Sequence, residues 1–368
     1  MIAAATPRAP GVDARLLVLM ASAELRHAPR ASLVDFLQPG DLVVANDAMT
    51  LPASLLGVHL ATGAPIELRL AGLQAPAGGD LRKSIAVAFG AGDFRMRTED
   101  RPAPPPLPAG DGLAFGDLRA RVVRKLGHPR LVAVAFDGSA EAMWQGLARH
   151  GRPIQYAHVP QPLALWDAWT AIAAVLVAFE PPSAGFVIDW ALLAALSRRG
   201  IAFATLTHAA GISSTGDAKL DRRLPLDEAY RIPDVTARAI GNTRRLGGRI
   251  VAIGTTVVRA LEHAAVRDGG ELACRSTVVS PGNGVADQRI GAVTTLRIVD
   301  AIVTGVHEPG SSHYELLRAF ADDEALRRAG VALVAHAYRG HEFGDSLLVE
   351  KSRTRQGEAP IADARFAA

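Results

Sequence analysis

The chain has 368 residues, of which 49% are hydrophobic and 21% charged, and its formal net charge is +3. These values are typical of a globular protein with about two domains and exclude a disordered chain, and a lone cysteine, Cys274, excludes an internal disulfide. The longest apolar run, Ala168 to Phe179, is too short to span a bilayer, and Met1 to Pro10 lacks the apolar core of a signal peptide, so we expect a cytoplasmic protein without membrane contact.

The N-terminal segment predicts a helix and then a strand. The helix is expected over Ala31 to Leu37 and the strand over Asp41 to Ala45, with a Pro39-Gly40 turn between them. Asn46 and Asp47 follow the strand directly. Polar residues at the carboxyl end of a strand occupy the place where α/β folds bind ligands.

From Gly57 to Arg152 the pattern changes to short alternating runs separated by Gly, Pro and Asp clusters, as in an antiparallel barrel or sandwich. Pro102 to Pro108 predicts an exposed loop. This segment holds 13 Lys and Arg against 9 Asp and Glu, a surplus that the rest of the chain lacks. Its densest basic patch comprises Arg119, Arg121, Arg124, Lys125, His128 and Arg130. Arg119 and Arg121 share one strand face, which suits either contact with phosphates or simple solvation.

After Arg152 the chain returns to alternating helices and strands. The segments are Trp166 to Phe179, Trp190 to Arg199, a strand Ile201 to Leu206, a helix Val235 to Leu246, a strand Arg297 to Val306, a helix Ser312 to Asp322 and a strand Ser346 to Glu350. The fold class predicted is α/β: a discontinuous α/β domain, residues 1–56 and 153–368, with an all-β, barrel-like domain inserted at residues 57–152.

The segment Arg249 to Glu262 predicts a buried strand, a tight turn at Gly254 and a helix capped by Thr255 or Thr256. The turn directs free backbone N–H groups and the positive end of a helix dipole at one point, and Arg259 lies about one turn further on. This arrangement suits a carboxylate or phosphate ligand. A well-capped core helix explains the same pattern.

Two further residues suit proton transfer. His208 closely follows a strand and precedes a loop rich in Gly and Ser, and Asp345 precedes the last strand. Each has a structural alternative, as a helix cap or a loop brace. Metal ligation by His307 with His313, or by His336 with His341, lacks an accompanying His-Glu-x-x-His helix or cysteine pair, so we expect no metal.

Read together, these segments resemble the S-adenosylmethionine:tRNA ribosyltransferase-isomerase family of queuosine biosynthesis. The matching segments, in family order, are PGDLVVAND (residues 39–47), PSAG (182–185), AIGTTVVRALE (252–262), VDAIVTGVHEP (299–309) and FGDSLL (343–348). The chain departs from the family pattern at Met49 and Ser54, where the family has arginines, and at Val187 and Gly305, where it has histidine and asparagine. A histidine-led loop is reduced to residues 208–213, and Leu226 replaces the histidine of a His-Ser-Glu motif.

The resemblance implies that S-adenosylmethionine donates its ribose to a deazaguanine aminomethyl group in the wobble position of tRNA, giving epoxyqueuosine. It implies no other cofactor and a monomer. For the catalytic group we expect His208 to transfer the proton, with Asp47, Asp345 and His307 as its polar companions. The implied substrate contacts are Asn46, Pro182, Ser183, Ala184, Gly185, Gly254, Thr255, Thr256, Arg259, Glu262, Pro281 and Gly282. The implied tRNA contacts are Arg119, Arg121, Arg124, Lys125 and Arg130. The replaced family residues leave two alternatives open, a non-catalytic nucleoside- or RNA-binding protein and a ribosyltransferase with another acceptor.

Overall fold

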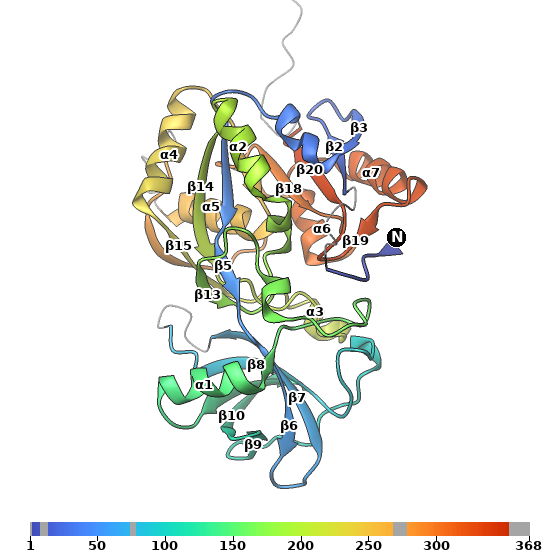
Figure 1. Ribbon diagram of the computed structural model, residues 1–368, viewed down its shortest axis with the longest axis vertical. Helices are drawn as coiled ribbons and strands as arrows, with labels where there is room; N and C mark the ends of the chain where they lie inside the picture. The colour runs from blue at the N-terminus through green and yellow to red at the C-terminus, as the bar shows by residue number, and fades with distance from the viewer. Residues whose placement is uncertain (1, 8–13, 74–78, 268–277, 353–368) are drawn as a thin grey trace, which may run out of the picture.

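The computed structural model describes residues 2–7, 14–73, 79–267 and 278–352. Figure 1 shows a large mixed sheet covered by helices, with a smaller β-structure below it. This confirms the predicted class, α/β with an inserted all-β barrel. Cys274 lies outside the described residues, and among those described no helix is long and apolar enough to cross a membrane.

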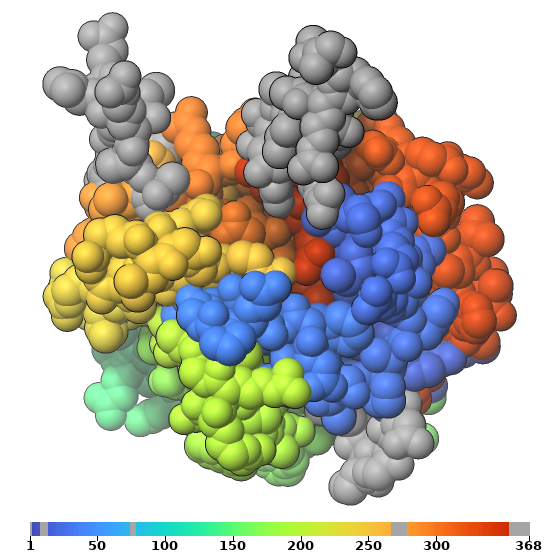
Figure 2. All heavy atoms as spheres, turned by 90° about the horizontal axis from the view of Figure 1, so that it is seen from above, coloured from blue at the N-terminus to red at the C-terminus, as the bar shows by residue number. Residues whose placement is uncertain are grey.

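Within the described residues, the large sheet has nine strands. In spatial order they are β17 (Gly282–Ala286), β15 (Glu228–Ile232), β14 (Ala202–His208), β4 (Leu42–Asn46), β16 (Ile250–Ile253), β18 (Ala301–Gly305), β20 (Ser346–Glu350), β2 (Arg15–Leu19) and β3 (Leu25–Pro29). The four strands β14, β4, β16 and β18 run parallel, so their carboxyl ends meet at one edge. Strand β2 pairs with β20, and Figure 2 shows the blue N-terminal and red C-terminal segments side by side.

Alternation along β4 explains how the sheet is buried on both faces. Leu42 and Val44 belong to one core cluster, with residues of α4 (Asp234–Arg245), α5 (Thr255–Arg267) and α7 (Asp323–Ala335). Val43 and Ala45 belong to another, with residues of α2 (Trp190–Arg198) and the 3₁₀ helix η1 (Arg30–Phe36). Successive strand residues point to opposite faces, so an unbroken apolar run is what a sheet with helices on both sides requires.

The second large sheet closes on itself. Its strands are β6 (Ser54–His59), β7 (Pro65–Leu73), β8 (Lys83–Phe89), β11 (Leu131–Phe136), β10 (Leu118–His128) and β9 (Gly112–Phe115), and β9 pairs back with β6 to complete an antiparallel barrel. Leu118, Ala120 and Val122 point into its core, while Arg119 and Arg121 are exposed. Strand β12 (Gly151–Arg152) adds to β6, and α1 (Ala140–His150) packs on the outside. The residue limits of the two predicted domains stay a prediction.

The other elements that the structure describes are short. They are β1 (Ile2–Ala3) with β19 (Arg339–Gly340), β5 (Ala48–Thr50) with β13 (Val175–Ala178), the 3₁₀ helices η3 (Thr98–Asp100), η4 (Leu165–Ala168) and η5 (Ser183–Val187), and the helices α3 (Ala218–Asp221) and α6 (Ser312–Leu317).

Several predicted elements differ in the structure. The helix expected over Ala31 to Leu37 is the 3₁₀ helix η1. Trp166 to Phe179 contains η4 and β13 instead of one element, because its β-branched end pairs with β5. The strand expected over Arg297 to Val306 is limited to β18, and the helix expected over Ser312 to Asp322 stops at Leu317. Helix α5 begins at Thr255, so the two threonines lie in its first turn and Gly254 stands at the cap position.

Candidate functional site

A cavity of about 570 Å³ lies at the carboxyl ends of the parallel strands. Its wall includes the Gly254 turn, residues 182–184 of the η5 segment, and Thr304 and Gly305 at the end of β18. A second cavity, of about 600 Å³, shares Glu180, His307 and His313 with the first. The structure thus brings three of the sequence-matched segments together around one space, at the edge of the sheet where α/β folds bind ligands.

The Gly254 turn presents the amino end of α5 to the first cavity. Gly254 has φ +96°, a conformation that favours glycine, and a Cβ there would lie 3.3 Å from the Ala184 Cβ. The Gly254 N–H donates a hydrogen bond to the Val303 carbonyl at 2.8 Å. Thr255 and Thr256 follow in the cavity wall. The free N–H groups and the dipole of a 13-residue helix favour a negative ligand here.

Arg259 lines the same cavity, but its guanidinium is already engaged. It forms a buried ion pair with Glu228 and donates to the carbonyls of Ala286 at 2.7 Å and of Leu226 and Gln288 at 3.3 Å each. Burial raises the pKa of Glu228, while Arg259 opposes this rise. A ligand anion that reaches Arg259 therefore shares it with Glu228.

His208 is fully buried at the end of β14, behind Glu228, and is not part of either cavity wall. Asn46 holds it in place, since its side chain accepts from the His208 N–H and donates to the His208 carbonyl, both at 2.9 Å. The His208 Nε2 lies 3.6 Å from a Glu228 carboxylate oxygen, and neither ring nitrogen has a hydrogen-bond partner among the described residues. Burial, reinforced by Arg259, lowers the pKa of His208 well below its ordinary value, so the ring is neutral.

His307 contacts both cavities. Its Nε2 lies 2.8 Å from the Thr304 Oγ1, and its ring stacks on His313 with centroids 4.6 Å apart. Burial, followed by the charges of His313 and His341, lowers the pKa of His307 well below the ordinary range. A neutral imidazole at this position can accept a proton or donate a hydrogen bond to a ligand.

The two predicted aspartates lie outside both cavity walls. Asp47 accepts a hydrogen bond from the Thr207 hydroxyl at 2.6 Å. Asp345 is buried, accepts the N–H groups of Arg15 and Arg339 and forms an ion pair with the Arg15 side chain at 2.9 Å. These contacts tie β2 and β19 to the start of β20, which is a bracing role.

Other predicted substrate contacts are also placed away from the cavities. Glu262 accepts the backbone N–H groups of residues 297–299. Gly185 is buried against Thr170, and Pro281 and Gly282 are exposed at the start of β17. Asn46, as described above, positions His208. Pro182, Ser183 and Ala184 do line the first cavity.

Glu180, which no sequence pattern singled out, lines both cavities. It is 7% exposed, accepts a hydrogen bond from the Tyr156 hydroxyl and accepts the Ser213 N–H at 3.1 Å. Among the described residues no ion pair involves it. Burial raises the pKa of Glu180 to about 7, and Glu342 adds to the rise against the hydrogen bonds of Ser213 and Tyr156. A carboxyl half-protonated near neutral pH suits general acid–base catalysis. The sequence feature that could have pointed to Glu180 is its position as a single acidic residue between an apolar run and the Pro181-Pro182 pair.

The basic patch lies on the outer surface of the barrel. Arg119, Arg121, Arg124 and Lys125 are exposed on β10. Arg130 instead turns inward, donates to the Arg101 carbonyl at 2.7 Å and lies over the Phe89 ring. Four of the five predicted tRNA contacts therefore share an accessible strand, and the fifth is half-buried and attached to a buried network.

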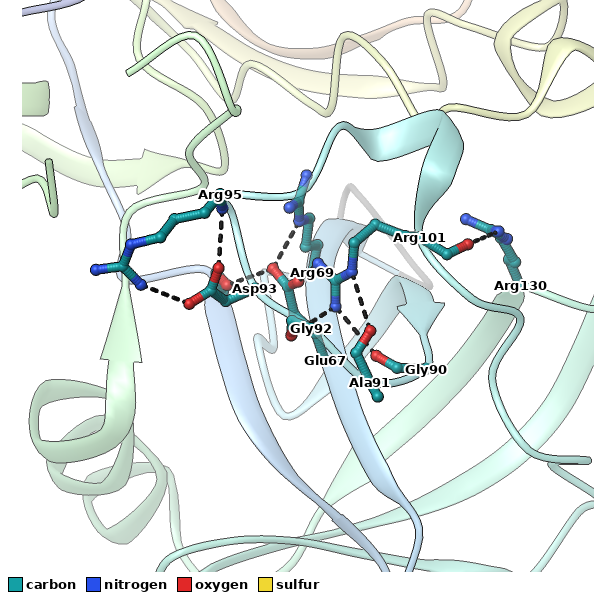
Figure 3. A network of polar contacts seen from close by, with 10 residues as sticks. Glu67, Arg69, Gly90, Ala91, Gly92, Asp93, Arg95, Arg101 and Arg130 are labelled. Atoms are coloured by element: carbon teal, nitrogen blue, oxygen red, sulfur yellow. Dashed lines mark hydrogen bonds and ion pairs between the residues drawn. The ribbon is translucent and has the colours of Figure 1, made fainter. Parts of the chain in front are cut away.

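That buried network centres on Glu67. Figure 3 shows its carboxylate between the guanidinium groups of Arg69 and Arg101, with Arg130 attached to the main chain of Arg101. The side chains of all three central residues are at most 2% exposed. Burial alone raises the pKa of Glu67, but Arg69 and Arg101 together hold it below its ordinary value. The network stabilises the barrel beside the second cavity. Arg69 also lies over the ring of Tyr156, 5.5 Å from its centroid, and Tyr156 lines that cavity.

Comparison with known proteins gives consistent matches over nearly the whole chain. The family model described as queuosine biosynthesis protein matches residues 1–349. A Pelobacter propionicus protein named S-adenosylmethionine:tRNA ribosyltransferase-isomerase is 33% identical, covering 93% of this chain and 94% of its own. A Synechococcus elongatus protein of the same name is 31% identical, covering 92% and 90%. A crystal structure of S-adenosylmethionine tRNA ribosyltransferase from Thermotoga maritima is 24% identical, with a TM-score of 0.48, covering 94% and 96%.

Proposed function

The chain belongs to the queuosine biosynthesis protein family, and from this membership we propose that it is an S-adenosylmethionine:tRNA ribosyltransferase-isomerase. It transfers and isomerises the ribose of S-adenosylmethionine onto 7-aminomethyl-7-deazaguanine in tRNA, giving epoxyqueuosine and releasing adenine and methionine. The observation that carries the proposal is the family match over residues 1–349. A tRNA substrate is consistent with a cytoplasmic protein, and we propose that it acts as a monomer.

The first cavity is the proposed site for S-adenosylmethionine. The amino end of α5 at Thr255 and Thr256 favours the methionine carboxylate, because helix N-termini stabilise negative charge. Arg259 adds positive charge to the cavity wall, and its ion pair with Glu228 reduces the effect of that charge on a ligand. Pro182, Ser183 and Ala184 also line this cavity, and Ala184 lies next to the Gly254 turn.

The reaction needs a base near the carbon beside the sulfonium, since the positive sulfur makes that C–H acidic, and a donor that assists adenine departure. Glu180 is our candidate for the base, because it lines the cavity and has no paired cation in the part of the chain that the structure describes. His307 is our candidate for the second proton-transfer group, being neutral and in the cavity wall. His208, Asp47 and Asp345 do not line either cavity and are proposed to position these groups and the strands that bear them.

The exposed face of β10 is the proposed contact with tRNA. Within the described ranges its four cations pair with no buried carboxylate, although Arg121 lies 3.2 Å from the exposed Asp137. Such a strand can neutralise several phosphates without reading sequence. The barrel would then hold the tRNA while the wobble base enters the cavity.

The deciding experiment measures adenine release from labelled S-adenosylmethionine in four parallel reactions: with deazaguanine-containing tRNA, with unmodified tRNA, with a free deazaguanine nucleoside and without RNA. We expect release only with the deazaguanine-containing tRNA. Release with a free deazaguanine nucleoside but not with the tRNA indicates a small-molecule acceptor. Binding of S-adenosylmethionine without release in any reaction indicates a non-catalytic binding protein. Either result contradicts the proposal.

A further inference from the structure

Three side chains with metal-binding atoms meet at the edge of the second cavity. His158 lies in the loop after β12, and His341 and Glu342 follow β19. One ligand atom from each residue lies within 4.8 Å of the ligand atoms of the other two. Within the described part of the chain, this is the one group of three or more such residues whose ligand atoms come this close. His341 and Glu342 contribute directly to the cavity wall.

The contacts within the cluster are close. The Nε2 of His158 lies 2.7 Å from a Glu342 carboxylate oxygen, and the two imidazole rings stack with centroids 4.1 Å apart. The side chains of His158 and Glu342 are 15% and 24% exposed, whereas His341 is open to solvent. The His341 backbone has φ +66°, a left-handed conformation that is uncommon for a residue with a side chain and that often marks functional positions.

We propose that His158, His341 and Glu342 form a site for a divalent metal ion of the zinc type. Two imidazole nitrogens and one carboxylate oxygen are ligands that Zn²⁺ prefers, and three protein ligands leave one coordination position open to the second cavity. This set differs from closed structural zinc sites, which have four protein ligands. None of its members belongs to the proposed base or anion site, although Glu342 and His341 act electrostatically on Glu180 and His307.

The sequence did not indicate this set. From the sequence we considered His341 with His336, and His307 with His313, as metal ligands, and we expected no metal. His336 is exposed and contacts His27 instead. The missing partners were His158, which is far away in the sequence, and Glu342, which is adjacent to His341 but carries no spacing motif.

The competing explanation is a simple ion pair between His158 and Glu342, in which His341 has no part. The two explanations predict different results for one variant. His341→Ala removes a metal ligand yet leaves the ion pair intact, and because His341 is exposed the substitution leaves the core unchanged.

The test is a titration of the full-length, metal-free protein with Zn²⁺ by calorimetry, together with the visible spectrum after Co²⁺ addition. We expect one Zn²⁺ per chain and absorption bands typical of tetrahedral Co²⁺. His341→Ala, His158→Ala and Glu342→Gln should each weaken binding at least ~10-fold, the lower end of what loss of an outer-shell partner costs. His150→Ala is the control, because His150 also pairs with a carboxylate, Asp117, without a third ligand.

Two results would overturn the proposal: no stoichiometric Zn²⁺ binding by the wild-type chain, or equal affinity in the wild type and in His341→Ala. Thermal unfolding of each variant shows whether it is folded, and His341→Ala decides the question if another variant is not. The titration needs neither S-adenosylmethionine nor tRNA. Its failure therefore leaves the proposed ribosyl transfer untouched, and failure of the adenine assay leaves the metal site untouched.

Discussion

Two buried carboxylates, Glu67 in the barrel and Glu180 at the cavity, have opposite environments. Glu67 lies between two guanidiniums, which hold its pKa below the ordinary value (Figure 3). Glu180 has a tyrosine hydroxyl and a backbone N–H as partners, and burial raises its pKa to about 7. The comparison shows that burial alone does not decide the role of an acid. A carboxylate with paired cations stays charged and stabilises the fold, whereas one without them is able to exchange a proton near neutral pH.

The largest expected effect is on catalysis, and it tests the difference between Glu67 and Glu180. Glu180→Gln keeps the shape of the side chain but removes its proton exchange, so adenine release should fall by roughly 100- to 10,000-fold. S-adenosylmethionine binding, measured by calorimetry, should remain. Glu99→Gln, which changes an exposed carboxylate of the barrel, is the control and should leave the rate unchanged. A rate for Glu180→Gln within a few-fold of wild type removes Glu180 from the mechanism.

The next effect is on stability and concerns Glu67. Glu67→Gln leaves two buried guanidiniums without a counter-charge, which should cost about 3–5 kcal/mol in the free energy of unfolding. Chemical denaturation at pH 8 measures this loss. Glu180→Gln in the same experiment should lose less than about 1 kcal/mol, because it removes a charge that burial disfavours. Equal losses in the two variants would contradict the distinction between them.

A third prediction concerns the pH dependence of stability. Between pH 4.5 and about 7 the unfolded chain has lost the Glu180 proton while the folded chain keeps it. The stabilisation present below pH 4.5 is therefore lost as the pH rises to about 7, by up to roughly 3 kcal/mol relative to Glu180→Gln. For Glu67, whose folded pKa is lowered, the contribution is present above pH 4.5 and lost as the pH falls. Denaturation of wild type and both variants should give slopes of opposite sign in two separate windows, between pH 4.5 and about 7 for Glu180 and below pH 4.5 for Glu67.

The smallest expected effect concerns the barrel surface. Replacing the four exposed cations of β10, Arg119, Arg121, Arg124 and Lys125, with Gln should weaken tRNA binding and reduce its salt dependence, by roughly 0.7–0.9 in the logarithmic slope for each phosphate that is no longer neutralised. Filter binding at several salt concentrations measures the slope. Arg327→Gln, an exposed arginine of α7, is the control. An unchanged slope in the β10 variant excludes this surface from tRNA binding.

Much of the fold was predictable because strong local patterns agreed with the tertiary contacts. The strand Ser346 to Glu350 was predicted with its observed limits, and the Gly254 turn followed from an apolar run, a glycine and a helical pattern. The prediction for Trp166 to Phe179 was wrong because the partner that determines its structure, β5, is more than 100 residues away.

The site was less predictable than the fold for the same reason. The sequence pattern leaves Arg259 free, yet its partner Glu228 lies on another element of the sheet. Asp345 suits proton transfer by its position before a strand, although Arg15 holds it from the opposite end of the chain. Glu180 carries no motif, and its properties come from Tyr156 and Ser213, which the fold brings close to it. Residue type and spacing predict which groups are present, but not which partners they meet.

The most direct test of the account is the titration of the Glu180 carboxyl itself, followed by carbon-13 NMR of the glutamate carboxyl signals and assigned with Glu180→Gln. The account predicts a midpoint near pH 7 for this signal. A midpoint at or below the ordinary glutamate value of about 4.3 would contradict it, because the carboxyl would then be charged at neutral pH like Glu67.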